Sequence, residues 1–504
     1  MKFLPHLLLT SLAFAALLAA APFAAQAQSL TSPAPIATQP VVAPPVVAVP
    51  KPATVPVVVP LPAMPAPVSI PGAVAPVTQP PASVVADPGA PVVAPGALGV
   101  APGALGVPPG APVVAPVVAA KPKPKPKRAA APAPPREMAL SDDPTPSFQP
   151  ETFFATAKAS EQYAAIVDAG GWPRIPSALA PGATGKVVAL LRQRLAMEGD
   201  IDAASGDGQT WDPALTTAVK RFQWRNGLRQ SGMVAGATLR AMNVPAATRF
   251  KQLASSAQRL AGINFNFGDR YVVVNIPSTA VEAVENGKVV HHYVAIVGDP
   301  DHRSPEVEAK ISAVNLNPTW TVPTSIIKNE IIPKMRRDPG YLSRARIRVL
   351  DSQNNIVEPG SIDWSGERAV NYTLRQDSGV GNSLGSIRIQ MTNKYSVYMH
   401  DTPSKRLFGA DYRFLSHGCV RVQGVYELAA WLLEGAGGSP TGKWDREALL
   451  GKIAGAARED VRLPKSVPVI WVYMTGWASA DGTVHFRDDV YQVDTVGAQA
   501  QAAQ

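Results

Sequence analysis

A proline-dense segment limits what this chain can fold into more than any other feature. Residues 29–150 contain 33 of the 52 prolines, and most of the remaining positions are Ala or Val. Between Phe23 and Phe148 there is no aromatic side chain around which a core could form. Proline removes backbone donors and favours extended polyproline II structure. We therefore expect residues 28–150 to be a disordered linker that acts as a tether, with globular structure beginning at Glu151.

The first 27 residues have the pattern of an export signal. Lys2 precedes an apolar run from Leu7 to Ala21, and Ala25-Gln26-Ala27 is a small-x-small cleavage site. The run is short for a spanning helix, which needs about 20 residues. This favours a cleaved signal peptide over an uncleaved membrane anchor, and it predicts a mature chain that begins at Gln28 in an oxidising compartment.

The formal net charge of +9 is concentrated outside the globular part. Residues 31–137 carry seven Lys or Arg and two acidic residues, which gives +5, while Lys2 adds +1 and residues 138–504 carry +3. The run from Lys121 to Arg128 alternates with proline, so it cannot form a helical face that reads nucleic acid. It is expected either to contact an anionic envelope surface or to be a solvated charge run, and nucleic-acid binding is disfavoured.

The residues from Glu151 onward predict an α+β fold with several parts. Residues 151–183 are expected to form a scaffold segment with a helix that ends near Gly170. Helical spacing of apolar residues predicts a unit of three helices in 184–248 and a connecting helix in 249–269. The pattern then predicts a mainly antiparallel sheet domain in 270–450, a scaffold or strand segment in 451–495 and a disordered tail in 496–504.

Alternating apolar residues and one turn signal predict where the strands of the sheet domain lie. Asn286-Gly287 between two such runs is a strong signal for a β-hairpin. The expected strands are 271–277, 280–285, 289–297, 311–316, 387–391 and 395–399, and the expected helical insertions are 326–335 and 425–434.

The predicted helical unit, residues 184–248, contains a recognisable sequence motif. Residues 218–228, followed by Gly232 and a helix over 237–242, resemble the three-helix peptidoglycan-binding module found in many wall enzymes. A plain helical packing domain is the alternative. The acidic loop from Asp200 to Asp207 lacks the carboxylate spacing of a calcium-binding loop.

The single cysteine of the chain, Cys419, lies in the phrase Ser416–Val422. A lone thiol is either a small buried apolar residue or a reactive group. His400 and His417 offer an imidazole that could favour the thiolate, and the amides of Gly418 and Cys419 could donate to an oxyanion. These side chains are too few for a zinc site, because there is no second Cys pair and no HExxH spacing. The constellation favours acyl transfer.

The arrangement of His400 before Ser-His-Gly-Cys-Val-Arg resembles the signature of the L,D-transpeptidase (YkuD-type) catalytic domain. The phrases 317–323, 326–330, 376–385 and 398–403 resemble the same family in its large, proline-linked periplasmic branch. The resemblance implies that Cys419 is the nucleophile and His400 the general base. It further implies roles at the oxyanion site or in the motif for Ser416, His417, Gly418 and Arg421.

The resemblance also implies a reaction. Cys419 would release terminal D-Ala from a peptidoglycan tetrapeptide stem, form a thioester and pass the stem to an amine of a second stem, which makes a 3→3 cross-link. The partners would be donor and acceptor stems in the periplasm of a Gram-negative type envelope, with no cofactor or metal, and Cys419 would be a carbapenem target. Acceptance by water, by a D-amino acid or by a protein lysine stays open, as does a catalytically inert wall-binding scaffold.

The loop 402–415 is expected to form a lid over the donor stem, with an ordinary surface loop as the alternative. The candidate lid or substrate residues are Tyr398, Phe408, Tyr412 and Arg413.

Overall fold

The computed structural model describes residues 136–495 except 206 and 207. The predicted signal peptide, the predicted linker up to residue 135 and the tail 496–504 lie outside the described residues. The chain divides into two units, 1–121 and 122–504, and every described residue belongs to the second. Within the described part, no helix is long and apolar enough to cross a membrane.

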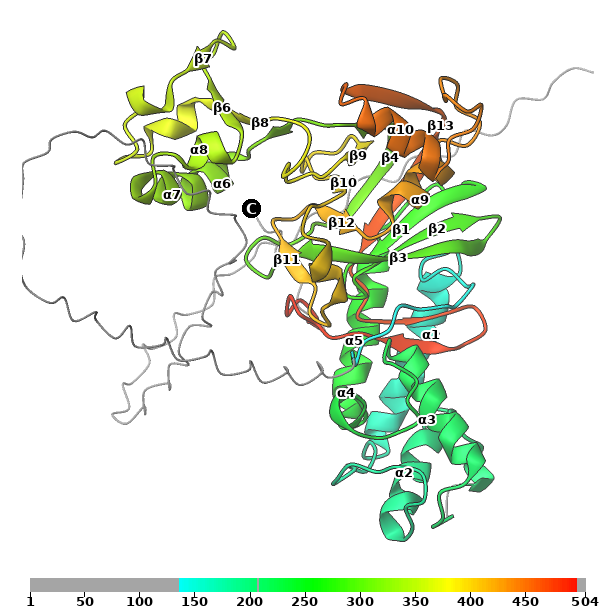
Figure 1. The fold of residues 1–504 in the computed structure, drawn as a ribbon. Helices are drawn as coiled ribbons and strands as arrows, with labels where there is room; N and C mark the ends of the chain where they lie inside the picture. Colours follow the sequence, from blue (N-terminus) through cyan, green and yellow to red (C-terminus); the bar gives the residue numbers. More distant parts are fainter. Residues whose placement is uncertain (1–135, 206–207, 496–504) are drawn as a thin grey trace, which may run out of the picture. The chain divides into compact units, whose positions relative to one another are not determined.

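Within the described residues, five α-helices precede the sheet, and their bounds follow from apolar spacing and local caps (Figure 1). The helix α3 begins after Asp212, whose side chain accepts the Leu215 N–H at 2.8 Å and so satisfies one of the free amides of the first turn. Leu191, Leu215 and Phe222 are almost fully buried in the core that joins α2, α3 and α4. These three helices are the helical unit that the sequence predicted. The bounds are α1 Thr152–Asp168, α2 Lys186–Ala196, the short 3₁₀ turn η1 Ala203–Ser205, α3 Pro213–Arg225, α4 Gly236–Met242 and α5 Ala246–Leu260.

A nine-stranded sheet forms the centre of the second half. Its order is β11-β3-β12-β10-β9-β4-β13-β1-β2, and β2 also pairs with β3, so the order closes on itself. Neighbours are mostly antiparallel, while β1–β13, β10–β12 and β3–β11 are parallel. The mainly antiparallel α+β fold is therefore confirmed. The bounds are β1 Arg270–Asn275, β2 Ala280–Glu285, β3 Lys288–Gly298, β4 Val307–Leu316, β9 Ile387–Met391, β10 Met399–His400, β11 Phe414–Ser416, β12 Val420–Val422 and β13 Glu459–Val472.

The predicted hairpin is present at the expected residues. Glu285 pairs with Lys288, and Asn286 and Gly287 both have positive φ angles, of 51° and 74°. Positive φ at both central positions is the requirement of the tight turn that suits a right-twisted hairpin.

Two helices and a C-terminal hairpin complete this half. The helices α9 Val425–Leu432 and α10 Arg446–Ala454 bury apolar side chains in the main core of the sheet, which includes Val274, Leu428 and Trp471. The strands β14 Gly476–Ala478 and β15 Val484–Phe486 pair with one another, and Ala478 and Phe486 pack with α1 and α5.

An inserted subdomain, residues 320–376, lies in the sequence between β4 and β9 and has its own core. Its four strands have the order β5-β8-β6-β7, and Leu342, Val349 and Leu374 are almost fully buried between them and the helices. The sequence predicted only a helix over 326–335 here. The bounds are β5 Trp320–Thr321, α6 Thr324–Ile326, the π-helical turn η2 Ile327–Ile331, α7 Ile332–Arg337, α8 Tyr341–Arg344, β6 Ile347–Leu350, β7 Ile356–Val357, η3 Pro359–Ser361, η4 Arg368–Asn371 and β8 Thr373–Gln376.

Two predicted boundaries and one predicted strand need correction. The segment 451–495 is not separate from the sheet, because β13 lies between β4 and β1 in the strand order, a long-range pairing that no local pattern reveals. The strand expected over 395–399 is shortened to β10, since Asn393 holds the backbone of Tyr395 and Val397 in a local turn. The predicted linker is also too long.

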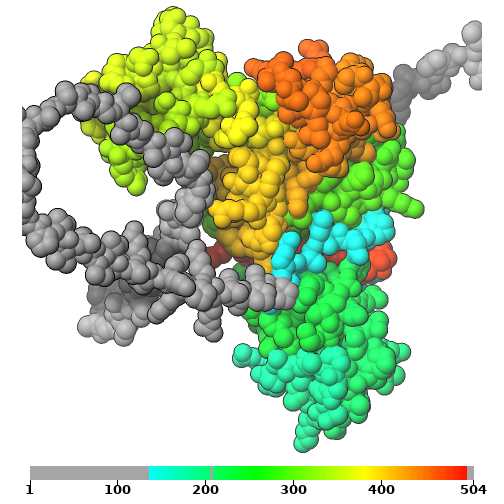
Figure 2. Space-filling view, in the orientation of Figure 1, coloured from blue at the N-terminus to red at the C-terminus, as the bar shows by residue number. Residues whose placement is uncertain are grey.

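Residues 136–150, which we call the N-terminal strap, pack against the folded part and are not linker. The strap is the cyan segment on the surface in Figure 2. Ala139 donates its N–H to the Gly227 carbonyl at 2.9 Å, and Phe148 is 5% exposed. Ser147 donates both its N–H and its hydroxyl to a carboxylate oxygen of Glu282 on β2, at 2.9 and 3.0 Å. Packing against the folded part therefore begins before Phe148, within the segment that the sequence assigned to the linker.

Glu282 should make the stability of the strap depend on pH. Burial raises its pKa from the ordinary value of 4.5 to about 7, so the folded state favours the protonated carboxyl. The resulting stabilisation is complete below pH 4.5 and is lost as the pH rises through about 7. We expect the urea midpoint of the native chain, relative to that of Glu282→Gln, to fall between pH 5 and pH 8.

The exposed carboxylate of Glu447 provides the matched control, because Glu447→Gln should leave the pH dependence of the urea midpoint unchanged. If the urea midpoints of Glu282→Gln and of the native chain depend on pH in the same way, the pKa of Glu282 does not differ between the folded and the unfolded state.

Candidate active site

The parallel pairing of β10 with β12 brings distant residues of the sequence to one place. Met399 pairs with Val420 and His400 pairs with Arg421, and Cys419 directly precedes β12. Side chains alternate between the two faces of a strand. Met399 and Val420 are fully buried in the main core, so His400, Cys419 and Arg421 belong to the opposite face (Figure 1 shows the two strands).

These side chains line one pocket of about 270 Å³. Tyr398 lies in it beside Cys419, and the loop at Ser383 and Leu384 forms part of its wall. Ser416 and His417 of the motif also line it, and the inserted subdomain supplies the remaining residues: Trp320, Pro323, Ile326, Glu330, Ile331, Lys334 and Tyr341. The pocket therefore lies between the core of the sheet and the core of the inserted subdomain.

His400 is 5% exposed, and its ring is held by backbone oxygen. The Nδ1–H donates to the carbonyl of Asp401, which leaves Nε2 as the proton acceptor. Burial and, to a smaller extent, the charge of Arg421 lower the pKa of His400 to about 3, against the opposing effect of the Asp401 and Leu384 carbonyls. The carboxylate of Asp401 has another role, since it accepts the Ser386 N–H at 3.0 Å and pairs with Lys405.

The thiol of Cys419 is held in its protonated form. Burial raises its pKa to about 11, although the N–H and hydroxyl of Tyr398 and the charges of Arg421 and Arg388 act in the opposite direction. The sequence led us to expect that a neighbouring imidazole favours the thiolate. The structure corrects this, because the cost of removing a thiolate from water exceeds what these neighbours return. Cys419 and His400 are both neutral at pH 7.

The motif around the thiol is a tight turn closed by serine hydroxyls. Ser416 Oγ donates to the Cys419 carbonyl at 2.5 Å and accepts the Gly418 N–H at 3.3 Å. Ser304 Oγ donates to the Gly418 carbonyl at 2.8 Å. Gly418 has a φ angle of +101°, a conformation that side chains strongly disfavour. Among the described residues no acceptor binds the Cys419 N–H, so of the two amides predicted for an oxyanion this one is available.

His417 points to the inserted subdomain. Its Nε2 lies 3.0 Å from Oε1 of Glu330, and its ring packs on that of His302 with centroids 4.4 Å apart. The hydrogen bond to Glu330 raises the pKa of His417, and the same bond lowers the pKa of Glu330 to about 2. Lys334 Nζ also contacts Glu330, at 2.8 Å. His417 therefore links the motif to the pocket wall, and His400 remains the candidate base.

Comparison with known protein families matches two parts of the chain. The family described as L,D-transpeptidase catalytic domain (YkuD) matches residues 269–441, and the "Putative peptidoglycan binding domain" family matches residues 184–242. Residues 269–441 therefore resemble an L,D-transpeptidase catalytic domain of the YkuD family.

A relative from Haemophilus influenzae, named "Putative L,D-transpeptidase", is 35% identical over 246 residues. The match spans about half of each protein, 48% of this chain and 48% of the relative. Solved structures that resemble the chain include an L,D-transpeptidase from Xylanimonas cellulosilytica (16% identity, 59% of this chain and 98% of that one, TM-score 0.19). Another is L,D-transpeptidase 1 of Mycobacterium tuberculosis (15% identity, 40% and 61%, TM-score 0.17). TM-scores this low carry no argument.

Within residues 269–441, Arg421 supplies a positive charge to the pocket. Burial lowers its pKa, while the nearby Cys419 and Glu330 raise it. A half-buried guanidinium facing the pocket is well suited to a carboxylate of the substrate. Within the described residues, no group of three or more His, Cys, Asp or Glu side chains is placed to hold a metal ion.

The loop 402–415, which was predicted to be a lid, does not cover the pocket of Cys419. Phe408 is 1% exposed and packs on Val294 and Ile296 of β3. Arg413 is buried and donates to the hydroxyl of Thr279 at 3.0 and 2.7 Å. Tyr412 lines a different cavity, and among the four candidates only Tyr398 lines the pocket of Cys419. The loop, which includes η5 Lys405–Gly409, turns Phe408 and Arg413 inward onto the sheet, while Lys405, Arg406 and Tyr412 stay exposed.

Sequence reasoning missed the residues of the inserted subdomain that do cover the thiol, including Trp320, Glu330 and Lys334. The phrases that contain Trp320 and Glu330 were noticed for their family resemblance, but no site role was predicted for them. A usable signal was the insertion of about 70 residues between the strand ending at Leu316 and the strand beginning at Ile387, because long insertions in compact domains are commonly functional.

The neutral thiol predicts a steep pH dependence of alkylation. The rate of Cys419 with iodoacetamide should rise about tenfold per pH unit between pH 7 and 9, because the thiolate fraction grows in this way well below a pKa of about 11. Mass spectrometry reports the adduct without ambiguity, since Cys419 is the only cysteine. N-acetylcysteine, with an ordinary pKa near 8.5, should begin to level off by pH 9. A plateau for Cys419 below pH 8 would show a preformed thiolate.

The bridge between His417 and Glu330 predicts a shift in a histidine titration. In Glu330→Gln the pKa of His417, followed by NMR of labelled imidazoles, should fall toward the ordinary value of about 6.5. Because the pKa is raised in the native chain, the bridge is strongest below pH 6.5 and weakens as the pH rises through the raised value.

Glu367 pairs with Lys328 on the exposed side of the same subdomain and serves as the control. Glu367→Gln should leave the titration of His417 unchanged. An unchanged titration in Glu330→Gln would mean that the two side chains do not pair in solution.

Proposed function

We propose that this chain is an exported, cysteine-dependent L,D-transpeptidase that makes 3→3 cross-links between peptidoglycan stems. The observation that carries the proposal is the placement of Cys419, His400 and Arg421 on one face of two adjacent strands, in one pocket of a YkuD-family domain. Family membership supports peptidoglycan cross-linking in general, and the geometry of the pocket supports the cysteine mechanism.

Acylation begins with a neutral thiol and a neutral imidazole. Sγ of Cys419 attacks the stem carbonyl that precedes terminal D-Ala, while Nε2 of His400 takes the thiol proton as the S–C bond forms. The carbonyl oxygen becomes an oxyanion, to which the Cys419 N–H can donate. When the tetrahedral intermediate collapses, the C–N bond to D-Ala breaks, and the His400 imidazolium gives its proton to the leaving amine. A thioester remains on Cys419.

The second half-reaction restores the enzyme. An amine of a neighbouring stem attacks the thioester carbonyl, and His400 takes a proton from that amine. The C–S bond then breaks, the proton passes to sulfur, and the cross-linked product leaves. The Asp401 and Leu384 carbonyls that oppose the lowered pKa of His400 would stabilise the transient imidazolium in both steps. Arg421 would hold a carboxylate of a stem against the pocket wall.

The remaining parts of the chain fit work at the cell wall. Residues 1–27 would direct export to the periplasm and 28–135 would form a tether, whose basic run 121–128 would contact an anionic envelope surface. The module that matches the peptidoglycan-binding family at 184–242 would hold the polymer near the pocket. Because carbapenems are acylating agents, we further propose that they acylate Cys419.

The decisive experiment incubates the full chain with disaccharide-tetrapeptide and identifies the products by mass spectrometry. The native chain should release D-Ala and form cross-linked dimers, and Cys419→Ala should do neither. His400→Gln should lower the rate by a factor of about 10² to 10⁴, the usual contribution of a positioned acid or base. His291→Gln is the matched control, since His291 is exposed and does not line the pocket.

The products also separate the competing acyl acceptors. Tripeptide monomer as the only product would assign an L,D-carboxypeptidase, and exchange of D-Ala for an added D-amino acid would assign an exchange activity. The absence of both D-Ala release and a carbapenem adduct at Cys419 would overturn the enzymatic proposal in favour of a wall-binding scaffold.

A further inference from the structure

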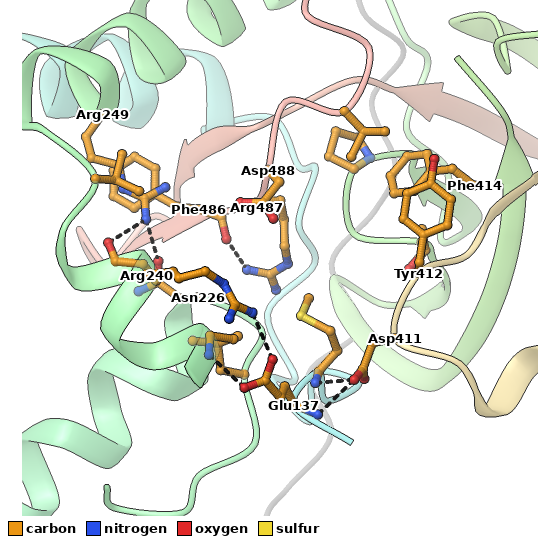
Figure 3. Close-up of a pocket in the computed structure, with 18 residues that line it drawn as sticks. Glu137, Asn226, Arg240, Arg249, Asp411, Tyr412, Phe414, Phe486, Arg487 and Asp488 are labelled. Atoms are coloured by element: carbon orange, nitrogen blue, oxygen red, sulfur yellow. Dashed lines mark hydrogen bonds and ion pairs between the residues drawn. The ribbon is translucent and has the colours of Figure 1, made fainter. Parts of the chain in front are cut away.

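A second cavity, of about 410 Å³, lies where segments far apart in the sequence meet (Figure 3). Its lining comes from the N-terminal strap, from α4 and α5, from the turn after β1, from the loop 411–414 and from the segment 486–490. The volume is within the range of small-molecule and peptide pockets. It shares no lining residue with the pocket of Cys419.

Arg487 is a nearly buried cation that faces this cavity without a direct ion pair, although the charges of Glu282 and Asp488 act on it favourably. It is 7% exposed, and its Nη1 donates to the carbonyls of Arg225 and Phe486 at 3.0 and 2.6 Å. Among the described residues, no acceptor binds its Nε or Nη2, and no carboxylate lies within ion-pair distance. Burial lowers its pKa to about 10, so it is charged at neutral pH. In Figure 3 the side chain reaches from the C-terminal segment toward the helices, across from Tyr412.

Arg249 is a second buried cation on the same cavity. It is 3% exposed and donates only to neutral oxygens, those of Gln252, Asn226 and Ala241, at 2.9, 3.2 and 3.2 Å. The charge of Arg249 also lowers the pKa of Arg487, so the two guanidinium groups repel one another. Glu282 and Asp488 offset part of the cost of burying Arg487, because both raise its pKa. Neither carboxylate binds the guanidinium directly, and an anion close to both arginines would offset more of that cost.

The acidic residues of the cavity do not supply this anion. The Glu137 carboxylate is bound by Arg240 at 2.8 Å and by the Ala237 N–H at 2.7 Å. The Asp411 carboxylate accepts the N–H groups of Glu137 and Met138, each at 3.0 Å. Asp488 is exposed at the rim. The interior is therefore cationic, and a carboxylate at the mouth disfavours a ligand that is anionic throughout.

The opposite wall is apolar and aromatic. Phe414 and Val490 line it, and the half-exposed ring of Tyr412 stands at its edge. The ring of Phe486 lies on the side of the cations, with the Arg249 guanidinium 4.4 Å from its centroid. Such a wall can bury the body of a ligand while a few polar groups fix its orientation. A purely inorganic anion would leave this wall without a function.

We propose that this cavity binds the carboxylate end of a peptide, with the carboxylate on Nε and Nη2 of Arg487 and the body against Tyr412 and Phe414. Resting on the proposed function, the peptide is a peptidoglycan stem, held at a site apart from the one where the thiol reacts. The strap closes the site, since Glu137 and Met138 bind Asp411 on one side while Glu137 binds Arg240 on the other.

Calorimetry on the full chain with Cys419 alkylated by iodoacetamide tests the cavity with the catalytic pocket blocked. The probes are disaccharide-tetrapeptide with a free terminal carboxylate, the same compound with a terminal amide, the disaccharide alone and acetate. We expect the acid to bind, the amide to bind at least tenfold more weakly, and the disaccharide not to bind. Acetate that binds as tightly as the peptide would overturn the peptide proposal.

Arg487→Gln should weaken binding of the acid at least tenfold and leave binding of the amide unchanged. Tyr412→Ala, at the surface of the cavity, should weaken both several-fold, and it keeps the test decisive if thermal unfolding shows that Arg487→Gln does not fold. Arg458→Gln, at an exposed arginine outside the cavity, is the control and should bind as the native chain does. Equal binding of acid and amide by the native chain would overturn the proposal.

The outcomes separate this proposal from the catalytic one. If the native chain forms dimers but the tetrapeptide does not bind to the alkylated chain, the cavity proposal is wrong and the transpeptidase proposal is unaffected. Binding of the acid to the alkylated chain, together with no D-Ala release by the native chain, would remove the transpeptidase proposal and leave the cavity site standing.

Discussion

The chemistry of this protein depends on one backbone interaction, the parallel pairing of β10 with β12. Both strands are very short, so their position is imposed by longer neighbours: β9 pairs with β10, and β3 pairs with β12. Because side chains alternate along a strand, this pairing puts the thiol and the imidazole on one face and sends Met399 and Val420 into the core. The geometry of the site is therefore a property of the whole sheet, and changes to the core would act on it.

The inserted subdomain gives the pocket its shape and also sets the state of its reactive groups. Burial keeps both Cys419 and His400 neutral, so proton transfer has to accompany attack on a substrate. Oxidation of cysteine follows thiolate character and exposure. A lone thiol held in this way in an oxidising compartment would be protected until a carbonyl reaches it. The inserted subdomain would thus affect both which substrate enters the pocket and how well the Cys419 thiol is protected from oxidation.

Local patterns in the sequence predicted most of the elements, because hairpins and helices depend on neighbouring residues. Asn286-Gly287 and the strand at 280–285 were predicted in this way. The choice of Cys419 and His400 as the reactive pair came from the family resemblance of their motif and stays a prediction. The sequence could not reveal β13 as a central strand, because pairing with β4 and β1 depends on contacts between residues more than 100 positions apart. The roles of Glu330 and Arg487 were missed for a similar reason, since each acts through burial and through partners from distant segments.

The position of β13 has a consequence for the order in which the protein can mature. The strand lies between β4 and β1 in the closed order of the sheet, yet it is among the last elements of the chain. While the chain is being synthesised from its N-terminus, the closed order stays incomplete until residues 459–472 emerge. The sheet that holds the strands of His400 and Cys419 can therefore be completed only when almost the entire polypeptide has been made.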